Sequence, residues 1–331
     1  MKITFYDSHP YDREFFDQAN QKFQFVLEYH DVRLNSETAS LARGASAVCV
    51  FVNDCVDEKT LEALRKLQVN TVALRCAGYD QVDLKAADRL GIRVVRVPRY
   101  SPHSVAEHAV ALIMGLNRKI CQTHERVAAG NYSLDGLLGF ELRGKTVGII
   151  GTGGIGSAFA QIMHGFGCKL TGYDLQKNAN LERDYKLVYQ SLESLIQHSD
   201  IISLHLPLTD KNRGFFNGDY FNQMKTGAMF INTSRGSLVD TQALIQALKS
   251  GKLGYAGLDV YDKEAGHFFC DQSNLILEDD ALARLLSFKN LLLTPHQAFF
   301  TREALHEIAE TTLLNIKGGS DSFSSEVHAS P

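Results

Sequence analysis

The sequence predicts an α/β fold built from two doubly wound parallel-sheet domains. Three observations support this prediction. Short apolar segments typical of strands alternate with segments of helical periodicity, which is the pattern of parallel β-α-β units. A glycine-rich turn follows one of these strands near the middle of the chain, so a whole α/β unit precedes it. The length of 331 residues is sufficient for two domains with separate cores.

The first series of elements covers residues 1 to about 98. Its expected strands are residues 3–6, 23–27, 47–51, 71–74 and 93–95. A helix is predicted over residues 60–67, where apolar residues recur at helical spacing, with Asp57 as its cap. Residues 97–102 then interrupt the pattern with two prolines, and we interpret this segment as a hinge.

The second series begins with a long helix expected from Ser104 to about Asn117, followed by an irregular, glycine-containing region. The expected strands are residues 147–150, 169–173, 201–204, 228–231, 255–258 and 291–293, and the expected helices are residues 157–166, 192–197, 241–249 and 301–316. We expect the last helix to return to the first unit. The predicted domains are therefore residues 1–100 with 299–331, and residues 101–298. The Ser- and Gly-rich tail, residues 318–331, is expected to be loosely ordered.

The composition is that of a soluble globular protein, with 44% hydrophobic and 22% charged residues. A formal net charge of −4 gives no electrostatic reason to expect nucleic acid or an anionic membrane as a partner. No apolar run approaches the roughly 18 residues that span a bilayer, and the N-terminus is typical of a strand rather than a signal peptide. The six cysteines include no C-x-x-C pair. We interpret them as buried thiols of a cytoplasmic protein, without a disulfide or metal framework.

The most informative segment is a G-x-G-x-x-G turn that follows the strand at residues 147–150. Gly151 permits the tight turn, Gly153 allows the backbone to approach a pyrophosphate, and Gly156 allows the following helix to pack closely. The N-terminus of that helix offers free N–H groups to phosphates. The combination of strand, turn and helix predicts a dinucleotide site; a plain glycine-rich turn is the alternative.

An acid, Asp174, follows 18 residues after the last glycine of this turn, at the end of the next strand. Its carboxylate can accept hydrogen bonds from both ribose hydroxyls of the adenosine half and would repel a 2′-phosphate. The sequence therefore favours NAD over NADP. An aspartate that caps a turn is the alternative, and the nearby Lys177 could weaken the discrimination.

Three polar positions follow strands of the same predicted sheet. Arg235 comes after the strand at residues 228–231, Glu264 after that at 255–258, and His296 after that at 291–293. Taken alone, an arginine capping a turn or a packed histidine would be the ordinary interpretation. Because parallel strands end at one edge of the sheet, we expect these side chains to meet at the edge that binds nucleotide.

The three residue types suit the reduction of a 2-oxo acid. Hydride goes from nicotinamide C4 to the carbonyl carbon, and a proton must reach the oxygen. His296 can supply that proton because imidazole titrates near neutral pH, and Glu264 would favour the imidazolium and orient the ring. Arg235 would hold the substrate carboxylate in a fork of two hydrogen bonds and polarise the carbonyl.

These segments together resemble the D-isomer-specific 2-hydroxyacid dehydrogenases, and within them the fermentative D-lactate dehydrogenases. The resemblance covers essentially the whole chain and is carried by residues 151–156, 204–209, 232–236, 257–261 with Glu264, and 294–299. It implies Arg235, Glu264 and His296 as the catalytic set. It also implies a flavodoxin-like substrate domain completed by the C-terminal helix, a Rossmann domain that binds NAD, and a homodimer or homotetramer built on the nucleotide domain.

The lactate branch of the family is suggested by residues 74–80 and 97–102. The resemblance implies that Ala77 and Gly78 offer backbone N–H groups to the substrate carboxylate, beside the contact from Arg235. Tyr100 would reach the substrate from the hinge, and Phe299 would close the pocket around a methyl-sized side chain. Packing between the lobes is the alternative for Tyr100 and Phe299.

The cofactor contacts implied by the glycine turn, the following acid and the resemblance lie at several strand ends. They are Gly151, Thr152, Gly153, Gly154, Ile155, Gly156, Asp174, Leu206, Pro207, Thr233 and Asp259. Thr233 and Asp259 would lie near the nicotinamide, and Leu206 and Pro207 against the adenine side. His205 could touch phosphate or serve a structural role.

We therefore expect an NAD-dependent enzyme that reversibly reduces pyruvate to D-lactate, with small 2-oxo and 2-hydroxy acids as substrates and neither nucleic acid nor a membrane as a partner. One alternative is a dehydrogenase for a bulkier 2-oxo acid, hydroxypyruvate or glyoxylate, because one methylene changes binding by only about 1–3 kcal/mol. Another is a dinucleotide-sensing protein of the corepressor type. Against that alternative, the chain lacks long basic or low-complexity extensions and keeps the whole catalytic set.

Overall fold

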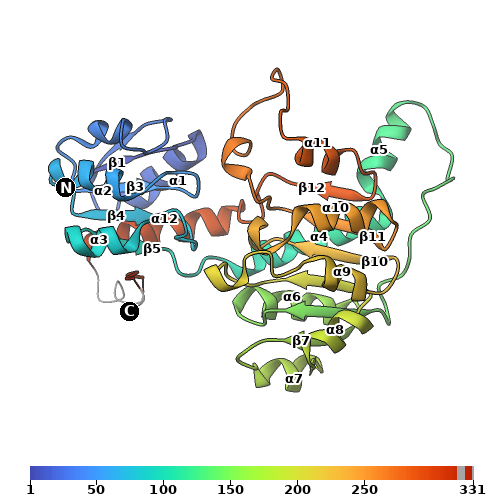
Figure 1. Cartoon of the computed structure of the whole chain (residues 1–331). Coiled ribbons are helices and arrows are strands. Elements are labelled where there is room, and N and C mark those ends of the chain that lie inside the picture. The colour runs from blue at the N-terminus through green and yellow to red at the C-terminus, as the bar shows by residue number, and fades with distance from the viewer. Residues whose placement is uncertain (319–324, 330–331) are drawn as a thin grey trace. The chain divides into compact units, whose positions relative to one another are not determined.

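The computed structural model describes residues 1–318 and 325–329. The chain divides into two compact units, shown in Figure 1. The first comprises Met1–Ser101 with Phe300–Pro331, and the second comprises Pro102–Phe299. Each predicted boundary falls one residue before the observed one. Among the described residues, no helix has both the length and the apolar character needed to cross a membrane.

The first unit contains a five-stranded parallel sheet in the order β2-β1-β3-β4-β5, which is the flavodoxin-like order. Its strands are β1 (Lys2–Phe5), β2 (Val26–Tyr29), β3 (Ala47–Val50), β4 (Thr71–Leu74) and β5 (Arg93–Arg96). Its helices are α1 (Pro10–Asn20), α2 (Glu58–Lys66), α3 (Leu84–Leu90) and α12 (Arg302–Lys317), with the 3-10 helix η1 (Thr38–Ala42). Helix α12 packs against α1, β4 and β5, so the last helix completes this unit.

Most elements expected in this unit are present, and Asp57 caps α2 by accepting a hydrogen bond from the Thr60 N–H. The strand expected at residues 23–27 is wrong for residues 23–25. Gln24 has a left-handed backbone, and β2 begins only at Val26. Helices α1 and α3 were not anticipated. The first buries Phe15, Phe16 and Ala19 at helical spacing behind a proline at its start.

The expectation of a loosely ordered tail is wrong for residues 325–329. Glu326 forms an antiparallel bridge with Val95 on the edge strand β5, and the Val327 N–H donates to the Val94 carbonyl at 3.0 Å. Asp88 of α3 accepts a hydrogen bond from the Ala329 N–H, which lowers the pKa of that carboxyl below its ordinary value. The remaining tail positions, residues 319–324 and 330–331, lie outside the described residues.

The second unit contains a seven-stranded parallel sheet in the order β12-β11-β10-β9-β6-β7-β8. Its strands are β6 (Thr146–Ile150), β7 (Lys169–Tyr173), β8 (Val188–Tyr189), β9 (Ile201–Leu204), β10 (Ala228–Asn232), β11 (Leu253–Leu258) and β12 (Leu291–Leu293). The order reverses beside β6, as in a Rossmann fold, and ligands of such sheets bind outside the carboxyl ends of the strands at that point. Ile150 pairs with both Tyr173 and Leu204, so the residues that follow these three strands share one edge.

Helices cover both faces of this sheet. They are α4 (Pro102–Arg118), α5 (Ile120–Ala128), α6 (Gly154–Gly165), α7 (Ala179–Tyr185), α8 (Leu192–His198), α9 (Gly218–Gln223), α10 (Thr241–Lys249) and α11 (Asp280–Leu286), with 3-10 helices η2 (Asp210–Asn212), η3 (Gly236–Leu238) and η4 (Glu264–Gly266). The expected helices are present, and α10 has the predicted bounds. Helix α5, however, lies where an irregular region was expected. None of its side chains is buried, and its apolar residues Ile120 and Val127 are exposed.

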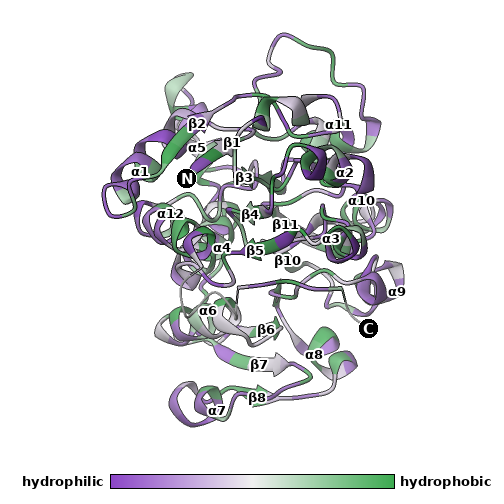
Figure 2. Cartoon of the chain, turned by 90° about the vertical axis from the view of Figure 1, so that its left-hand side faces the viewer, coloured by the Kyte–Doolittle hydropathy of each residue, from purple (hydrophilic) through white to green (hydrophobic). Residues whose placement is uncertain are grey.

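Two apolar clusters form on opposite faces of the seven-stranded sheet. Ile150 and Phe230 belong to one cluster, whereas Ile149 and Ile231, their neighbours in sequence, belong to the other. Successive strand residues point to opposite faces, so both clusters are supplied by the same strands. Figure 2 shows the complementary pattern on helices such as α7, whose outer side is hydrophilic.

The six cysteines are all free thiols, but only three of them are buried: Cys49, Cys76 and Cys168. The interpretation of all six as buried is wrong for Cys55, Cys121 and Cys270, which are exposed. Cys121 lies on α5, which buries no side chain, and the other two exposed thiols lie in connecting segments. Local hydrophobicity around these positions did not reveal that exposure.

Candidate active site

The glycine turn after β6 has the geometry expected of a dinucleotide-binding turn. Gly151 has φ of +95°, and a Cβ there would lie 2.3 Å from the His205 carbonyl oxygen. A Cβ on Gly156 would lie 2.0 Å from the Gly151 carbonyl oxygen, so α6 can approach the turn only with glycine at that position. These two close contacts explain why larger residues do not fit at the first and last positions of the motif.

The middle of the turn is open, in contrast to its ends. Nothing lies within 4 Å of the position that a Cβ on Gly153 would occupy. Gly153 is the N-cap of the 12-residue helix α6 and provides no side-chain cap, so the first N–H groups of the helix, at Gly154 and Ile155, are available to an anion. A pyrophosphate fits this open, positively polarised end of the helix.

Asp174 lies just beyond β7 and faces this turn. One of its carboxylate oxygens accepts hydrogen bonds from the Thr152 N–H at 2.6 Å and the Thr152 hydroxyl at 3.2 Å. Together with Thr152, Gly153, Gln176 and Lys177, it lines a surface hollow. A ribose whose hydroxyls donate to Asp174 fits this hollow. Lys177 packs over the Tyr189 ring, with its ammonium 5.7 Å from the ring centroid.

His205 follows β9 and is partly buried. Its ring packs on Phe159 with centroids 5.0 Å apart, and its Nε2 lies 3.0 Å from the Ser203 hydroxyl. Burial lowers the pKa of His205 to about 3, so its imidazole is neutral at physiological pH. The Nε2 atom thus has a partner within the protein, whereas the buried Nδ1 has no hydrogen-bond partner among the described residues.

The other positions implied as cofactor contacts also lie at strand ends of the second unit. Leu206 and Pro207 follow β9, and Pro207 is exposed. Thr233 follows β10; only 7% of it is exposed, and its hydroxyl oxygen makes no hydrogen bond with any residue that the structure describes. A buried hydroxyl without a protein partner fits a site completed by a ligand. Direct contacts of these residues with NAD stay predictions.

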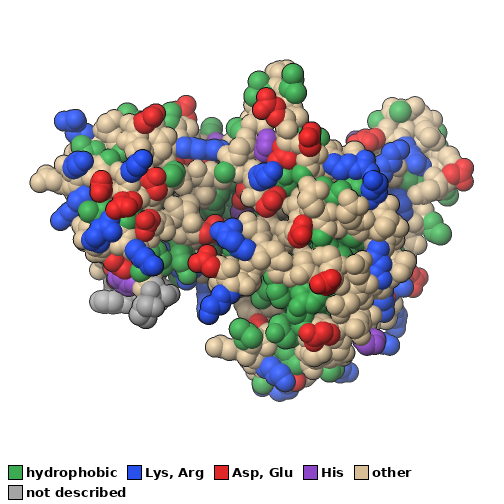
Figure 3. All heavy atoms as spheres, in the orientation of Figure 1, with side chains coloured by type: hydrophobic (Ala, Val, Ile, Leu, Met, Phe, Trp, Pro, Cys, Tyr) green, Lys and Arg blue, Asp and Glu red, His purple; other side chains and the backbone are tan. Residues whose placement is uncertain are grey.

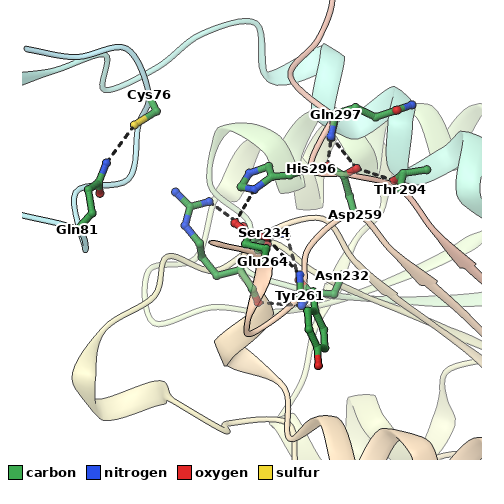
Figure 4. Close-up of polar contacts among 12 residues, drawn as sticks. Cys76, Gln81, Asn232, Ser234, Asp259, Tyr261, Glu264, Thr294, His296 and Gln297 are labelled. Carbon is green, nitrogen blue, oxygen red and sulfur yellow. Dashed lines mark hydrogen bonds and ion pairs between the residues drawn. The ribbon is translucent and has the colours of Figure 1, made fainter. Parts of the chain in front are cut away.

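A histidine and a carboxylate meet in the segments that follow β12 and β11, with Glu264 at the start of η4. His296 Nδ1 lies 2.8 Å from Glu264 Oε1, and the two side chains point toward each other in Figure 4. Both are largely buried, with 12% and 17% of their side chains exposed. Because the carboxylate holds Nδ1, it orients the ring. The other ring nitrogen, Nε2, is left to exchange a proton.

A fully buried aspartate holds the loop that carries His296. Asp259 has no exposed surface, and its two carboxylate oxygens accept hydrogen bonds from the Gln297 N–H at 2.9 Å and the Ala298 N–H at 2.8 Å, as Figure 4 shows for Gln297. Its backbone carbonyl accepts from the His296 N–H at 2.8 Å. His296 has φ of +55°, a conformation unusual for residues with a Cβ, and these contacts hold the loop in that shape.

Two further residues, Thr294 and His108, contact Asp259 and were not singled out from the sequence. The Thr294 hydroxyl donates to Asp259 at 2.5 Å, and His108 Nε2, from α4, lies 2.9 Å from that hydroxyl. His108 also lies 3.3 Å from the Asp259 carboxylate. Thr294 belongs to a segment already quoted for the resemblance, whereas His108 sits within an ordinary amphipathic helix. No local signal marks it, because its partners come from the other end of the second unit.

Arg235 lies at the end of β10, and a glycine brings its loop close to that of Glu264. A Cβ on Gly236 would lie 2.0 Å from the Tyr261 backbone carbon, so the two loops are in direct backbone contact. The Arg235 guanidinium donates to the Ser234 carbonyl at 2.7 Å, and Ser234 in turn donates to the Leu204 carbonyl of β9. The structure therefore places Arg235, Glu264 and His296 at one edge of the seven-stranded sheet.

The residues expected to bind substrate are divided between the units. Phe299 is buried in the second unit, with 6% of its surface exposed. Ala77 and Gly78 follow β4 in the first unit and are half-buried, and Tyr100 precedes the boundary at residue 101. That these residues share one substrate with Arg235 stays a prediction.

The dinucleotide turn, the acid that follows β7 and the paired histidine and carboxylate define a nicotinamide-dependent dehydrogenase. Comparison with known proteins narrows this class. The family model described as "D-isomer specific 2-hydroxyacid dehydrogenase, NAD binding domain" matches residues 110–298. The chain belongs to the D-isomer specific 2-hydroxyacid dehydrogenases, and its cofactor is NAD.

The similar proteins match the chain over almost its whole length. A 2-hydroxyacid dehydrogenase homolog of Haemophilus influenzae is 50% identical over 96% of this chain and 95% of its own. The D-lactate dehydrogenase of Escherichia coli is 48% identical over 96% of both chains. The structure of the pyruvate reductase of Chlamydomonas reinhardtii has a TM-score of 0.90 and 45% identity, covering 96% of this chain and 95% of that one.

Proposed function

We propose that the protein is a D-lactate dehydrogenase that reduces pyruvate with NADH and, in the reverse direction, oxidises D-lactate. The pair of His296 and Glu264, at 2.8 Å, is the observation that carries this proposal, because it supplies the proton exchange that the reaction requires. The identity of 48% with the E. coli D-lactate dehydrogenase supports pyruvate as the substrate.

The chemistry of the residues follows from their positions. Bound NADH supplies the hydride. His296 gives its Nε2 proton to the oxygen of the substrate carbonyl, and Glu264 holds Nδ1 in place through the hydrogen bond between them. Arg235 holds the substrate carboxylate and stabilises the negative charge that develops on the oxygen. Lactate oxidation uses the same groups in reverse, with neutral His296 accepting the hydroxyl proton.

Four further residues complete the proposed substrate contacts. Ala77 and Gly78 would donate their N–H groups to the substrate carboxylate, and Tyr100 would contact the same substrate. Phe299 would limit the space around the side chain of the 2-oxo acid, which favours the methyl group of pyruvate. Family membership supports this set, and Ala77 and Gly78 are half-buried residues next to β4.

The proposal is tested by comparing kcat/KM for pyruvate, phenylpyruvate, hydroxypyruvate and glyoxylate with NADH, and for D- and L-lactate with NAD. We expect pyruvate to be the best 2-oxo acid and D-lactate to be oxidised in strong preference to L-lactate. The His296→Gln variant, purified in parallel, controls for contaminating dehydrogenases. A clear advantage of another 2-oxo acid would reassign the substrate, and NADH binding without any turnover would remove the enzymatic role.

We also propose that two copies of the chain associate through an arm of the second unit, formed by α5 and residues 129–145, as a homodimer or as part of a homotetramer. The arm exposes Ile120, Tyr132, Leu134 and Leu138 at 58%, 75%, 81% and 87% of their surfaces. In Figure 3, hydrophobic side chains are visible along the outer margin of the second unit, where Figure 1 draws α5. A second copy would bury this apolar surface.

Light scattering after gel filtration tests the association. We expect a dimer or tetramer for the wild type and a smaller species for a variant with Leu134→Asp and Leu138→Asp. The matched control is Ile276→Asp, which changes an equally exposed side chain (90%) outside the arm. A wild type that elutes as a monomer, or a control that dissociates equally, would contradict the role of the arm.

We further propose a cytoplasmic location. The six free cysteines, three of them exposed, suit a reducing compartment better than an oxidising one. Fractionation of the source cells, with activity and antibody followed together, tests this location. Recovery in an oxidising compartment would contradict it.

A further inference from the structure

The turn that follows β4 presents two backbone N–H groups that the protein does not use. Neither the Ala77 N–H nor the Gly78 N–H donates a hydrogen bond to any residue that the structure describes. The preceding residue is fixed, because the Cys76 carbonyl accepts from the Val97 N–H at 3.2 Å. The Cys76 thiol also lies 3.3 Å from the Gly78 carbonyl oxygen. The turn is therefore held in place while its donors remain available.

An arginine contacts the peptide group between these two residues. The Arg96 Nη1, at the end of β5, donates to the Ala77 carbonyl oxygen at 2.6 Å. That carbonyl and the Gly78 N–H belong to one peptide unit. A charge-assisted hydrogen bond to the oxygen polarises the unit and makes its N–H a stronger donor. Arg96 thus acts on Gly78 through the peptide bond.

Among the residues that the structure describes, no acidic side chain pairs with Arg96. Among the described residues no carboxylate lies within 4 Å of its guanidinium, and its buried Nε makes no hydrogen bond. Its other contact is the Tyr79 ring, 5.0 Å from the guanidinium carbon. A half-buried cation with no described carboxylate beside it adds positive potential at the turn and favours an anion there.

The backbone of Arg96 is anchored on both sides. Its N–H donates to the Ser325 carbonyl of the tail at 2.9 Å, and its carbonyl accepts from the Asn315 side chain of α12 at 2.9 Å. The C-terminal segment thereby fixes the strand end from which the guanidinium extends. The side chain can then hold the Ala77 peptide without a large loss of its own conformational freedom.

We propose that Arg96 is a positioning residue for the substrate carboxylate: it orients and polarises the Ala77–Gly78 peptide so that the Gly78 N–H binds that carboxylate. This proposal rests on the function proposed above, in which Ala77 and Gly78 contact substrate. It adds a residue that acts on the substrate through the backbone of the turn.

Kinetics provide the first test. We expect Arg96→Gln to raise the KM for pyruvate, and the Ki for the isosteric inhibitor oxamate, by about tenfold, while kcat at saturation changes less than about threefold. Arg96→Lys, whose ammonium can still donate to the carbonyl, should recover part of this loss. The matched control is Arg93→Gln on the same strand, where the arginine donates to the Asn315 and Ile316 carbonyls of α12 instead.

A spectroscopic test follows the peptide itself. The sequence contains four Ala-Gly pairs, at 77–78, 129–130, 256–257 and 265–266. Deuterated protein with ¹³C-carbonyl alanine and ¹⁵N-glycine therefore gives four correlations, and loss of one in Ala77→Ser identifies that of Gly78. We expect Arg96→Gln to move the Ala77 carbon and the Gly78 nitrogen upfield and to leave the other three in place, which also reports that the variant is folded.

The two tests separate this proposal from the function on which it depends. If the wild type reduces no 2-oxo acid, the proposed function fails. The role proposed for Arg96 then stands only if oxamate shifts the Gly78 signal in the wild type but not in Arg96→Gln. An unmoved Gly78 signal in Arg96→Gln would overturn the proposal even in an active enzyme. So would an equal rise in KM in Arg93→Gln, because the effect would then come from the anchoring of β5.

Discussion

The two units present different kinds of chemistry at the carboxyl ends of their parallel strands. In the second unit, His296 is paired with Glu264 and its loop is clamped by Asp259, so the polar groups of that loop are fixed by the protein. In the first unit, the turn at Ala77 and Gly78 leaves its N–H groups unused among the described residues. Proton transfer requires a side chain in one fixed orientation, whereas recognition of an anion requires donors that the protein leaves unsatisfied. We therefore expect variants of His296 to alter kcat and variants of the turn to alter KM.

The largest effect is expected from His296→Gln, which removes proton exchange and leaves the shape of the loop. We expect kcat for pyruvate to fall by about three orders of magnitude, with the Kd for NADH changed less than about threefold. Fluorescence titration of NADH and steady-state kinetics measure the two quantities. His198→Gln, an exposed histidine on α8, is the matched control. An equally large loss of NADH binding would show that His296 serves the cofactor and not the chemistry.

A smaller effect is expected from Arg235→Lys, because a single ammonium cannot replace a fork of two hydrogen bonds to a carboxylate. We expect the KM for pyruvate to rise about tenfold or more. The exposed Arg213, changed to lysine, is the control. Unchanged kinetics in Arg235→Lys would show that Arg235 does not bind the substrate carboxylate. Binding of that carboxylate would then depend on the first unit alone.

Asp174→Ala tests the cofactor side of the second unit. The variant loses the carboxylate that repels a 2′-phosphate, so we expect the preference for NADH over NADPH to fall about tenfold or more in kcat/KM. Asp184→Ala, which removes an exposed carboxylate on α7, is the comparison. If Asp174→Ala keeps its full preference for NADH, another part of the hollow at residues 174–180 excludes the phosphate.

The last predicted effect concerns stability rather than catalysis, and it involves His205. Burial lowers its pKa to about 3, well below the ordinary 6.5. As the pH falls below 6.5, His205 takes up a proton in the unfolded chain but not in the folded protein. The free energy of unfolding that this residue contributes above pH 6.5 is therefore lost, by at most about 1.4 kcal/mol per pH unit. We expect the wild type to lose about 2 kcal/mol more than His205→Gln between pH 7 and pH 5. Thermal unfolding at both pH values measures the difference; parallel losses would mean that His205 also protonates in the folded state.

Much of the fold follows from local patterns. The buried strands β3, β4, β9 and β10 are short apolar runs, and α10 has a regular helical period, so their positions could be predicted from the sequence. The strand β2 and the helix α5 could not be placed correctly, because neither buries a full face. The pairing of residues 325–329 with β5 was missed for a related reason: a polar tail gains order only when an edge strand offers it hydrogen bonds.

The candidate site divides in the same way. The sequence by itself determined the glycine turn, Asp174 and the three strand-end residues, because each depends on a residue type placed next to a recognisable strand. Only the tertiary structure decided what holds them: His108 meets Thr294 from 186 residues away, and Arg96 meets Ala77 from 19 residues away. Such contacts depend on how distant elements pack, and a side chain that acts through a partner leaves no mark in its own local sequence.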